Sequence, residues 1–199
     1  MLVREIMTSP AYRVHEGASL EAALQMLVTG GVTSLPVVDR AGRVVGIISE
    51  ADVLHEHLVP DPRAHLRLVP ADSGPLPTTV GEVMTVDPHT VREDSDVAEL
   101  AHTFAETSWK SVPVVRGDVL LGVVSRSDVI RAMARPDSDI AAEVSKAFAE
   151  IGQQAWQADV IDRVVHISGT ASDRDLAAAT SLAQAILGVR RVISEQPDA

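Results

Sequence analysis

The sequence contains one block twice, and this internal repeat restricts the possible folds more than any other feature. Val3-Arg-Glu-Ile-Met-Thr8 returns 77 positions later as Val80-Gly-Glu-Val-Met-Thr85. The same offset carries Ser34-Leu-Pro-Val-Val38 to Ser111-Val-Pro-Val-Val115. Agreement in this order over about fifty positions indicates two copies of one supersecondary unit, which bury their apolar faces by packing together. We place the copies at residues 1–58 and 80–134.

The apolar periodicity predicts the same elements in each copy. An amphipathic helix comes first, and an apolar hairpin with a tight turn follows it. Pro36 and Pro113 cannot donate to a ladder, so we expect them at strand starts or exposed edges. Each unit therefore reads as strand, helix, strand, strand, helix, a mixed α/β fold. The apolar helix positions are Leu20, Ala23, Leu24, Leu27 and Val28 in the first copy, and Val97, Leu100, Ala101, Phe104 and Ala105 in the second.

The second strand of each copy ends in a Ser-x-x-Asp pattern that opens a helix, Ser49 to Asp52 and Ser125 to Asp128. A helix N-terminus presents unpaired N–H groups and a partial positive charge, which suit a phosphate or another polar group. The aspartates either cap the turn or accept hydrogen bonds from a vicinal diol such as a ribose. Capping is the commoner use of such a pattern, and its duplication favours a binding role.

These motifs together resemble the cystathionine-β-synthase (CBS) domain, present here as a tandem pair over residues 1–134. The resemblance implies two clefts related by pseudo-twofold symmetry that bind adenosine-containing ligands. It implies that Asp52 and Asp128 bind the ribose hydroxyls, and that Ser49 and Ser125 contact the ribose or the phosphate. Residues expected to line the adenine slots are Thr8, Ser34 and Pro36 in one unit, and Thr85, Ser111 and Pro113 in the other.

The two predicted clefts differ in charge. Glu50 follows the serine in the first copy, whereas Arg126 follows it in the second, with Arg131 one turn further on. A cation near a helix N-terminus binds phosphate oxygens and a carboxylate repels them, so we expect phosphorylated ligands in the Ser125/Asp128 cleft. The Ser49/Asp52 cleft is then expected to bind weakly, to take an adenosine without phosphate, or to stay empty. The alternative for Arg126 is a solvated surface charge.

Residues 59–79 separate the copies and contain five prolines, so they are expected to form a linker across the surface. Arg63, His65 and Arg67 lie in this stretch, either as exposed charges or within reach of a bound phosphate. The seven histidines of the chain show no metal-ligand spacing, and we predict no metal site.

Arg135-Pro-Asp-Ser138 ends the repeat, and a helix, two strands, a helix and a strand are expected after it. The predicted ranges are 139–151, 156–161, 164–168, 173–187 with Gly188 as its cap, and 189–193. We expect Ile140, Val144, Ala147, Phe148 and Ile151 to form the buried face of the first helix.

This segment, residues 137–195, resembles the BON domain through Val164-Val-His-Ile-Ser-Gly169, an Ala-rich helix and the Gly188-Val189 junction. The resemblance implies an αββαβ fold that attaches to phospholipid or to other macromolecules. From Asp137 onward the chain has 5 Lys/Arg against 10 Asp/Glu, which disfavours an anionic membrane. Arg163, Arg190 and Arg191 form either a small basic face or solvated strand ends.

Composition excludes several classes of function. The formal net charge of −11 makes nucleic acid an improbable partner, and the absence of cysteine excludes disulfides and thiolate metal sites. No long apolar segment signals export or membrane spanning, so we expect a cytoplasmic protein. No nucleophile stands at a usable spacing from a base, and there is no Gly-rich phosphate loop, so we expect no enzyme activity and no required cofactor.

The sequence therefore predicts a homodimeric, non-catalytic sensor. In this hypothesis an adenine nucleotide or related adenosyl effector, such as AMP or ATP, binds the CBS clefts. Its binding changes the interaction of the BON domain with an unidentified protein partner. The competing hypothesis is an interaction protein without nucleotide sensing, in which the BON domain tethers the chain to a partner or to a membrane surface. A hidden enzyme is a third possibility, and it would turn over the bound nucleotide.

Overall fold

The computed structural model describes residues 1–57, 77–170 and 172–194. The chain divides into two compact bodies. The repeat body consists of Met7–Ser95 and His102–Arg126, and the C-terminal body consists of Met1–Ile6, Asp96–Ala101 and Ser127–Ala199. No helix among the described residues is long and apolar enough to cross a membrane.

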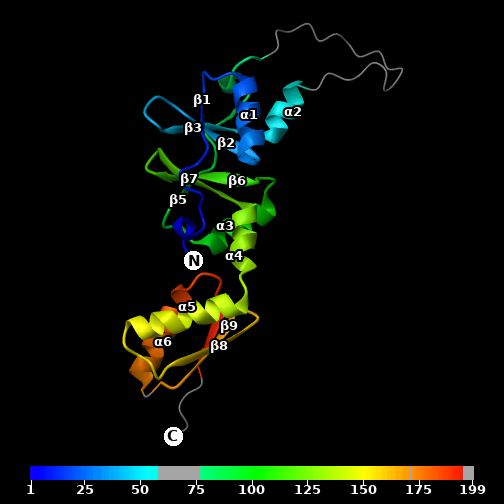
Figure 1. Cartoon of the computed structure of the whole chain (residues 1–199). Coiled ribbons are helices and arrows are strands. Elements are labelled where there is room, and N and C mark those ends of the chain that lie inside the picture. Colours follow the sequence, from blue (N-terminus) through cyan, green and yellow to red (C-terminus); the bar gives the residue numbers. More distant parts are fainter. Residues whose placement is uncertain (58–76, 171, 195–199) are drawn as a thin grey trace, which may run out of the picture. The chain divides into compact units, whose positions relative to one another are not determined.

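Both copies of the repeat follow the predicted order of strand, helix, strand, strand, helix (Figure 1). In each, a short first strand pairs in parallel with the second, which pairs antiparallel with the third. The first copy contains β1 (Val14–His15), α1 (Leu20–Gly30), β2 (Ser34–Val38), β3 (Val44–Ser49) and α2 (Glu50–His57). The second contains β5 (Val91–Arg92), α3 (Val97–Glu106), β6 (Ser111–Arg116), β7 (Val119–Ser125) and α4 (Arg126–Met133). A 3₁₀ turn opens each copy, at Val3–Glu5 and Val80–Glu82, and β4 (Thr85–Val86) follows the 3₁₀ turn of the second copy.

The segment that opens each copy lies on the sheet of the other copy. β4 pairs with β3 to give a sheet of order β1-β2-β3-β4, whereas Thr8 forms an antiparallel bridge with Val123 of β7. Gly46 and Gly122 make this crossing possible, because Met84 and Thr85 lie against Gly46, and a Cβ at Gly122 would stand 2.7 Å from the Thr8 carbonyl oxygen. The exchange is reciprocal, as a pseudo-twofold pair requires.

The hairpin turns of the two copies also bond to each other. The Val44 amide donates to the Asp118 carbonyl oxygen at 2.9 Å, and the Leu120 amide donates to the Gly42 carbonyl oxygen at 3.1 Å. Together with the exchanged segments, these bonds make the two sheets parts of one body.

Helix α1 forms because Ser19 caps it, accepting a hydrogen bond from the Ala22 amide, and Gly31 ends it with a φ of 59°. Its predicted apolar face is mostly correct, since Leu20, Ala23 and Leu27 are buried, but Val28 is 79% exposed. Val28 lies at the edge of the stripe in the last turn, where no element among the described residues covers it. In the second copy Val97, Leu100 and Phe104 are buried, and Ala105 is exposed.

Pro36 and Pro113 lie within β2 and β6 with buried side chains, not at the strand starts. Strand β1 pairs with β2 only from Val37 onward, and β5 pairs with β6 only from Val114 onward. Each proline precedes that point, so one side of its strand is an unpaired edge there and no amide donor is required. Most of the predicted linker lies outside the described residues, including Arg63, His65, Arg67 and four of its prolines.

The C-terminal body has the predicted element order. It contains α5 (Asp137–Glu150), β8 (Gln157–Ile161), β9 (Val164–Ser168), α6 (Asp173–Ala185) and β10 (Arg191–Ser194). The sheet order is β10-β9-β8, with β9 antiparallel to β8 and parallel to β10. Both helices pack on one face of this sheet (Figure 1).

Apolar side chains from both helices and from β9 form the core of this body. Ile140, Val144 and Phe148 are buried as predicted, and Phe148 meets Trp156 edge to face at 5.3 Å between ring centroids. Ile151 is 50% exposed, against the prediction, because α5 ends at Glu150 and the chain turns away there. Helix α6 ends at Ala185, two residues before the predicted end, and Gly188 (φ 94°) lies in the turn that follows.

Candidate functional site

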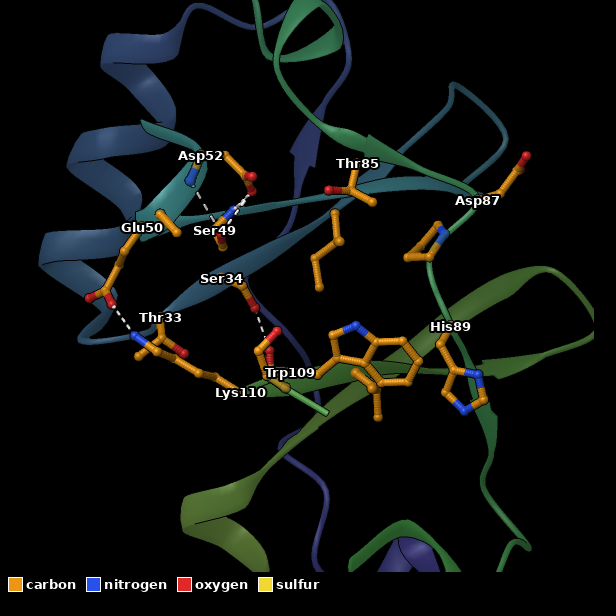
Figure 2. A pocket seen from close by; sticks show the side chains of 16 residues that line it. Thr33, Ser34, Ser49, Glu50, Asp52, Thr85, Asp87, His89, Trp109 and Lys110 are labelled. Atoms are coloured by element: carbon orange, nitrogen blue, oxygen red, sulfur yellow. Dashed lines mark hydrogen bonds and ion pairs between the residues drawn. The ribbon is translucent and has the colours of Figure 1, made fainter. Parts of the chain in front are cut away.

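The repeat body contains a cavity of about 600 Å³ that residues of both copies line. Figure 2 shows these side chains around the cavity, with Thr85 and Asp52 facing Ser34 and Trp109 across it. The lining consists of Thr33, Ser34, Ile47, Ser49, Glu50, Ala51, Asp52, Thr85, Asp87, Pro88, His89, Ser108, Trp109, Lys110, Ser111 and Val112.

The Ser-x-x-Asp junction of the first copy lies on this lining and is also a helix cap. The backbone amide and the hydroxyl of Ser49 both donate to Oδ2 of Asp52 at 2.7 Å, and the Asp52 amide lies 3.4 Å from the Ser49 hydroxyl. The two interpretations of Asp52, as a helix cap and as a ribose acceptor, are therefore compatible. Oδ2 serves the cap, and Oδ1 of Asp52 has no hydrogen-bond partner among the described residues.

Five of the residues predicted from the sequence meet at this cavity: Ser34, Ser49, Asp52, Thr85 and Ser111. The structure places Thr85, and not Thr8, in the cavity with Ser49 and Asp52, so that this lining combines predicted residues of both units. The cause is the exchange of opening segments, which carries Thr8 to β7 of the second copy. Ser34 and Ser111, both buried, hydrogen-bond to each other through their hydroxyls.

The other predicted residues lie away from this cavity. Pro36 and Pro113 are inside their strands, and Ser125 ends β7. The Arg126 guanidinium donates from Nη2 to the carbonyl oxygen of Thr107, and its buried Nε has no hydrogen-bond partner in the part of the chain that the structure describes. This arrangement differs from the solvated surface charge that was the alternative interpretation of Arg126.

In the C-terminal body, Asp128 is 8% exposed and accepts a hydrogen bond from Nη1 of Arg131 at 2.9 Å. The Arg131 side chain is itself 76% exposed, so water screens this ion pair on one side. The ribose and phosphate roles of Asp128, Arg126 and Arg131 stay predictions.

Sequence reasoning missed an aromatic wall of the cavity. Trp109 and His89 stack with ring centroids 4.9 Å apart and an interplanar angle of 20°. Trp109 is 40% exposed, so part of its indole is accessible. The available signal was its rarity, because the chain has only two tryptophans and this one stands two residues before Ser111.

A cross-copy ion pair was missed as well. Nζ of Lys110 lies 3.1 Å from Oε2 of Glu50, and the two residues come from different copies of the repeat. The charge of this cavity is therefore not set by Glu50 alone. Its lining carries the carboxylates of Glu50, Asp52 and Asp87 together with one lysine. No group of three or more potential metal ligands occurs among residues 1–57, 77–170 and 172–194.

Known proteins share the repeat and its fold. The sequence model of the CBS domain matches residues 3–58 and 80–135. The chloroplastic CBS domain-containing protein CBSX2 of Arabidopsis thaliana is 31% identical over 135 residues, covering 60% of this chain and 57% of that protein. The A-adding tRNA nucleotidyltransferase of Aquifex aeolicus is 30% identical over 131 residues, which cover 66% of this chain but 14% of the enzyme. The chain thus spans little more than half of the first relative and a small part of the second.

Two solved structures carry ligands. CBSX2 in complex with AMP superposes with a TM-score of 0.54 and 31% identity, covering 66% of this chain and 94% of that one. The CBS domain pair of protein MJ0100, in complex with 5′-methylthioadenosine and S-adenosyl-L-methionine, superposes with a TM-score of 0.53 and 27% identity, and the coverage of the two chains is the same as for CBSX2. The matched residues, the duplicated fold and these structural neighbours lead to one conclusion: the chain belongs to the CBS domain family, as a tandem pair.

Proposed function

We propose that this protein is a non-catalytic regulatory protein that binds an adenosyl ligand in the cavity of its repeat body. The observation that carries the proposal is the meeting of the Ser49–Asp52 junction with the Trp109 ring on one cavity. Its volume of about 600 Å³ lies in the range of small-molecule sites. Solved neighbours of the same fold hold adenosyl compounds, which supports the assignment.

The residues suggest a role for each part of the ligand. Oδ1 of Asp52 is available to accept hydrogen bonds from ribose hydroxyls while Oδ2 maintains the helix cap. The accessible part of the Trp109 ring offers a stacking surface for adenine. Thr85, beside β3, and the Ser34–Ser111 pair supply polar groups between these two places.

For the second predicted cleft we retain Ser125, Arg126, Asp128 and Arg131 as proposed ligand contacts. We also propose that residues 137–195 act as an output domain of the BON type, that the protein works as a homodimer in the cytoplasm, and that ligand binding changes what the output domain binds. Such coupling requires a ligand with different affinity for two conformations.

A thermal-shift screen of the full chain against adenosine, AMP, ATP, S-adenosylmethionine and NAD tests the binding proposal. Ligands that bind the folded state raise the melting temperature by mass action. Asp52→Asn should reduce the shift, because it removes the charge and leaves one side-chain oxygen where the cap and the ribose each need an acceptor. Trp109→Ala should reduce the shift because it removes the stacking surface. Glu106→Gln, on an exposed part of α3 outside the cavity lining, serves as the control. No shift with any adenosyl compound would overturn the proposal.

One observation favours the alternative, an interaction protein without nucleotide sensing. Ile161 and Ile193 are 64% and 38% exposed and lie on the face of the β10-β9-β8 sheet opposite its core. In the described part of the chain these two isoleucines lie among Asp159, His166 and Arg191, a mixed apolar and charged face that would suit contact with a partner. The alternative predicts that partner binding is indifferent both to adenosyl ligands and to Asp52→Asn.

A further inference from the structure

Trp109, the Ser49–Asp52 junction and the Glu50–Lys110 ion pair lie in that order across the cavity. Figure 2 shows Trp109 and His89 on one side and Lys110 reaching Glu50 on the other, with Ser49 and Asp52 beside the ion pair. A nucleoside with its base on Trp109 and its ribose at Asp52 would direct its 5′ substituent away from the base. That substituent would then meet Glu50 and Lys110.

A charged ligand can bind Lys110 or Glu50 in place of the other member of the ion pair. The side chains of Lys110 and Glu50 are 59% and 45% exposed, and exposed pairs contribute little to stability. A phosphate that pairs with Lys110 leaves the Glu50 carboxylate unpaired beside it, with Asp52 two residues further along α2. A neutral substituent leaves the pair intact, and a cationic one gains Glu50.

The formal charges of the lining point in the same direction. Three carboxylates, of Glu50, Asp52 and Asp87, stand against the single lysine, so with His89 neutral the lining carries a net negative charge. Like charges brought together in a partly enclosed site repel, and the cost grows as water is excluded. The lysine alone therefore does not make this cavity a phosphate site.

We propose that the Glu50–Lys110 pair selects the adenosyl ligand by the charge of its 5′ substituent, so that this cavity prefers neutral or cationic adenosyl compounds over phosphorylated ones. This selection rests on the proposed function, since it needs an adenosyl ligand in the cavity. It assigns Glu50 and Lys110 as specificity-determining residues of the site.

Calorimetric titration of the full chain with adenosyl compounds whose 5′ substituents differ in charge tests the selection. Adenosine is the neutral reference, AMP adds a phosphate, and S-adenosylmethionine differs from S-adenosylhomocysteine by one methyl group and the sulfonium charge. We expect adenosine to bind more tightly than AMP, and S-adenosylmethionine more tightly than S-adenosylhomocysteine. Raising the salt concentration should narrow both differences, because mobile ions screen the exposed pair.

Glu50→Gln should shift the preference toward AMP, because it frees Lys110 from its ion pair. We expect AMP to gain about fivefold in affinity, the equivalent of about 1 kcal/mol, and adenosine to stay unchanged. Lys110→Gln should weaken AMP further without affecting adenosine. The matched control is Glu93→Gln, which breaks another exposed ion pair of the repeat body, with Arg116 at 2.7 Å, and makes the same charge change outside the cavity.

The outcomes separate the two proposals. Tighter binding of AMP than of adenosine by the wild-type protein, or an unchanged AMP affinity in Glu50→Gln, would overturn the charge selection and leave adenosyl binding intact. Failure of adenosine and of every other adenosyl compound to bind would overturn the proposed function, and the charge selection with it.

Discussion

Ser34 and Ser111 occupy equivalent positions in the two copies of the repeat, and their hydroxyls form a hydrogen bond to each other in the buried lining of the cavity. The pair lies where β2 of one copy meets β6 of the other. A contact between equivalent residues is expected of two units related by a pseudo-twofold axis, and it fixes the two serines at the same depth in the site.

The first prediction concerns this pair. Ser34→Ala or Ser111→Ala alone should destabilise the protein by about 1–2 kcal/mol, because each leaves the other hydroxyl buried without its partner. The double variant should lose less than the sum of the two, since it leaves no unpaired hydroxyl behind. Urea unfolding of the four proteins in a double-mutant cycle measures the difference. Strictly additive losses would contradict a direct bond.

The second prediction concerns the approach of β4 to β3. Gly46→Ala should cost about 1–3 kcal/mol of stability and weaken any cavity ligand, because the added Cβ would meet Met84 and the Thr85 carbonyl oxygen. The matched control is Gly17→Ala, where a Cβ would meet nothing within 4 Å. Unfolding curves and ligand titration of both variants provide the test. Equal effects at the two glycines would show that β4 tolerates displacement.

The sequence supported the prediction of the Ser49–Asp52 junction because the pattern is local. A strand end, a cap and the first turn of a helix all fall within a few residues, and the observed bonds of Asp52 are those of a cap. The same reasoning located the elements of the C-terminal body. It failed for Val28 and Ile151, which continue an apolar stripe past the point where neighbouring elements cover it.

The composition of the cavity depends on contacts between distant residues, and these were not readable from either copy alone. Thr85 lies opposite Ile47, in the same cavity as Ser49, only because the opening segments are exchanged between the sheets. Lys110 reaches Glu50 over 60 residues of chain. Each copy by itself suggests that its opening Met-Thr serves its own cleft. Only the pairing of β4 with β3 identifies the true neighbour.

The third prediction is a pH dependence of stability. Glu82 accepts hydrogen bonds from the amides of Thr78 and Thr79 at 2.9 and 2.8 Å, and these bonds lower the pKa of its carboxyl below the usual value. A group whose pKa is lowered on folding stabilises the protein above its unfolded pKa, and this stabilisation disappears as the pH falls through the folded pKa.

Glu82→Gln should therefore flatten the loss of stability on acidification below the ordinary pKa of a glutamate, about 4.3. Urea unfolding of the wild type and the variant between pH 3 and pH 7 measures this slope. Glu106→Gln is the control, because Glu106 pairs only with the exposed His102 on its own helix among the described residues. Parallel pH profiles for wild type and Glu82→Gln would contradict the role of this carboxylate.

The last prediction concerns the hairpin of the C-terminal body. Asp162 and Arg163 both have positive φ, 51° and 64°, in the turn between β8 and β9. The carboxylate of Asp137, at the start of α5, accepts hydrogen bonds from their amides at 2.8 and 3.0 Å and so holds the turn against the helix.

Asp137→Ala removes both acceptors and should lower the free energy of unfolding by about 1–2 kcal/mol, because two backbone donors then depend on water alone. Asp139→Ala makes the same charge change in the same helical turn, where the described bond of the carboxylate is to Ser138 and not to the hairpin, and it should cost less. Hydrogen exchange of the Asp162 and Arg163 amides reports the effect directly: both should exchange faster in Asp137→Ala than in Asp139→Ala, and equal rates would show that the turn holds its conformation without this carboxylate.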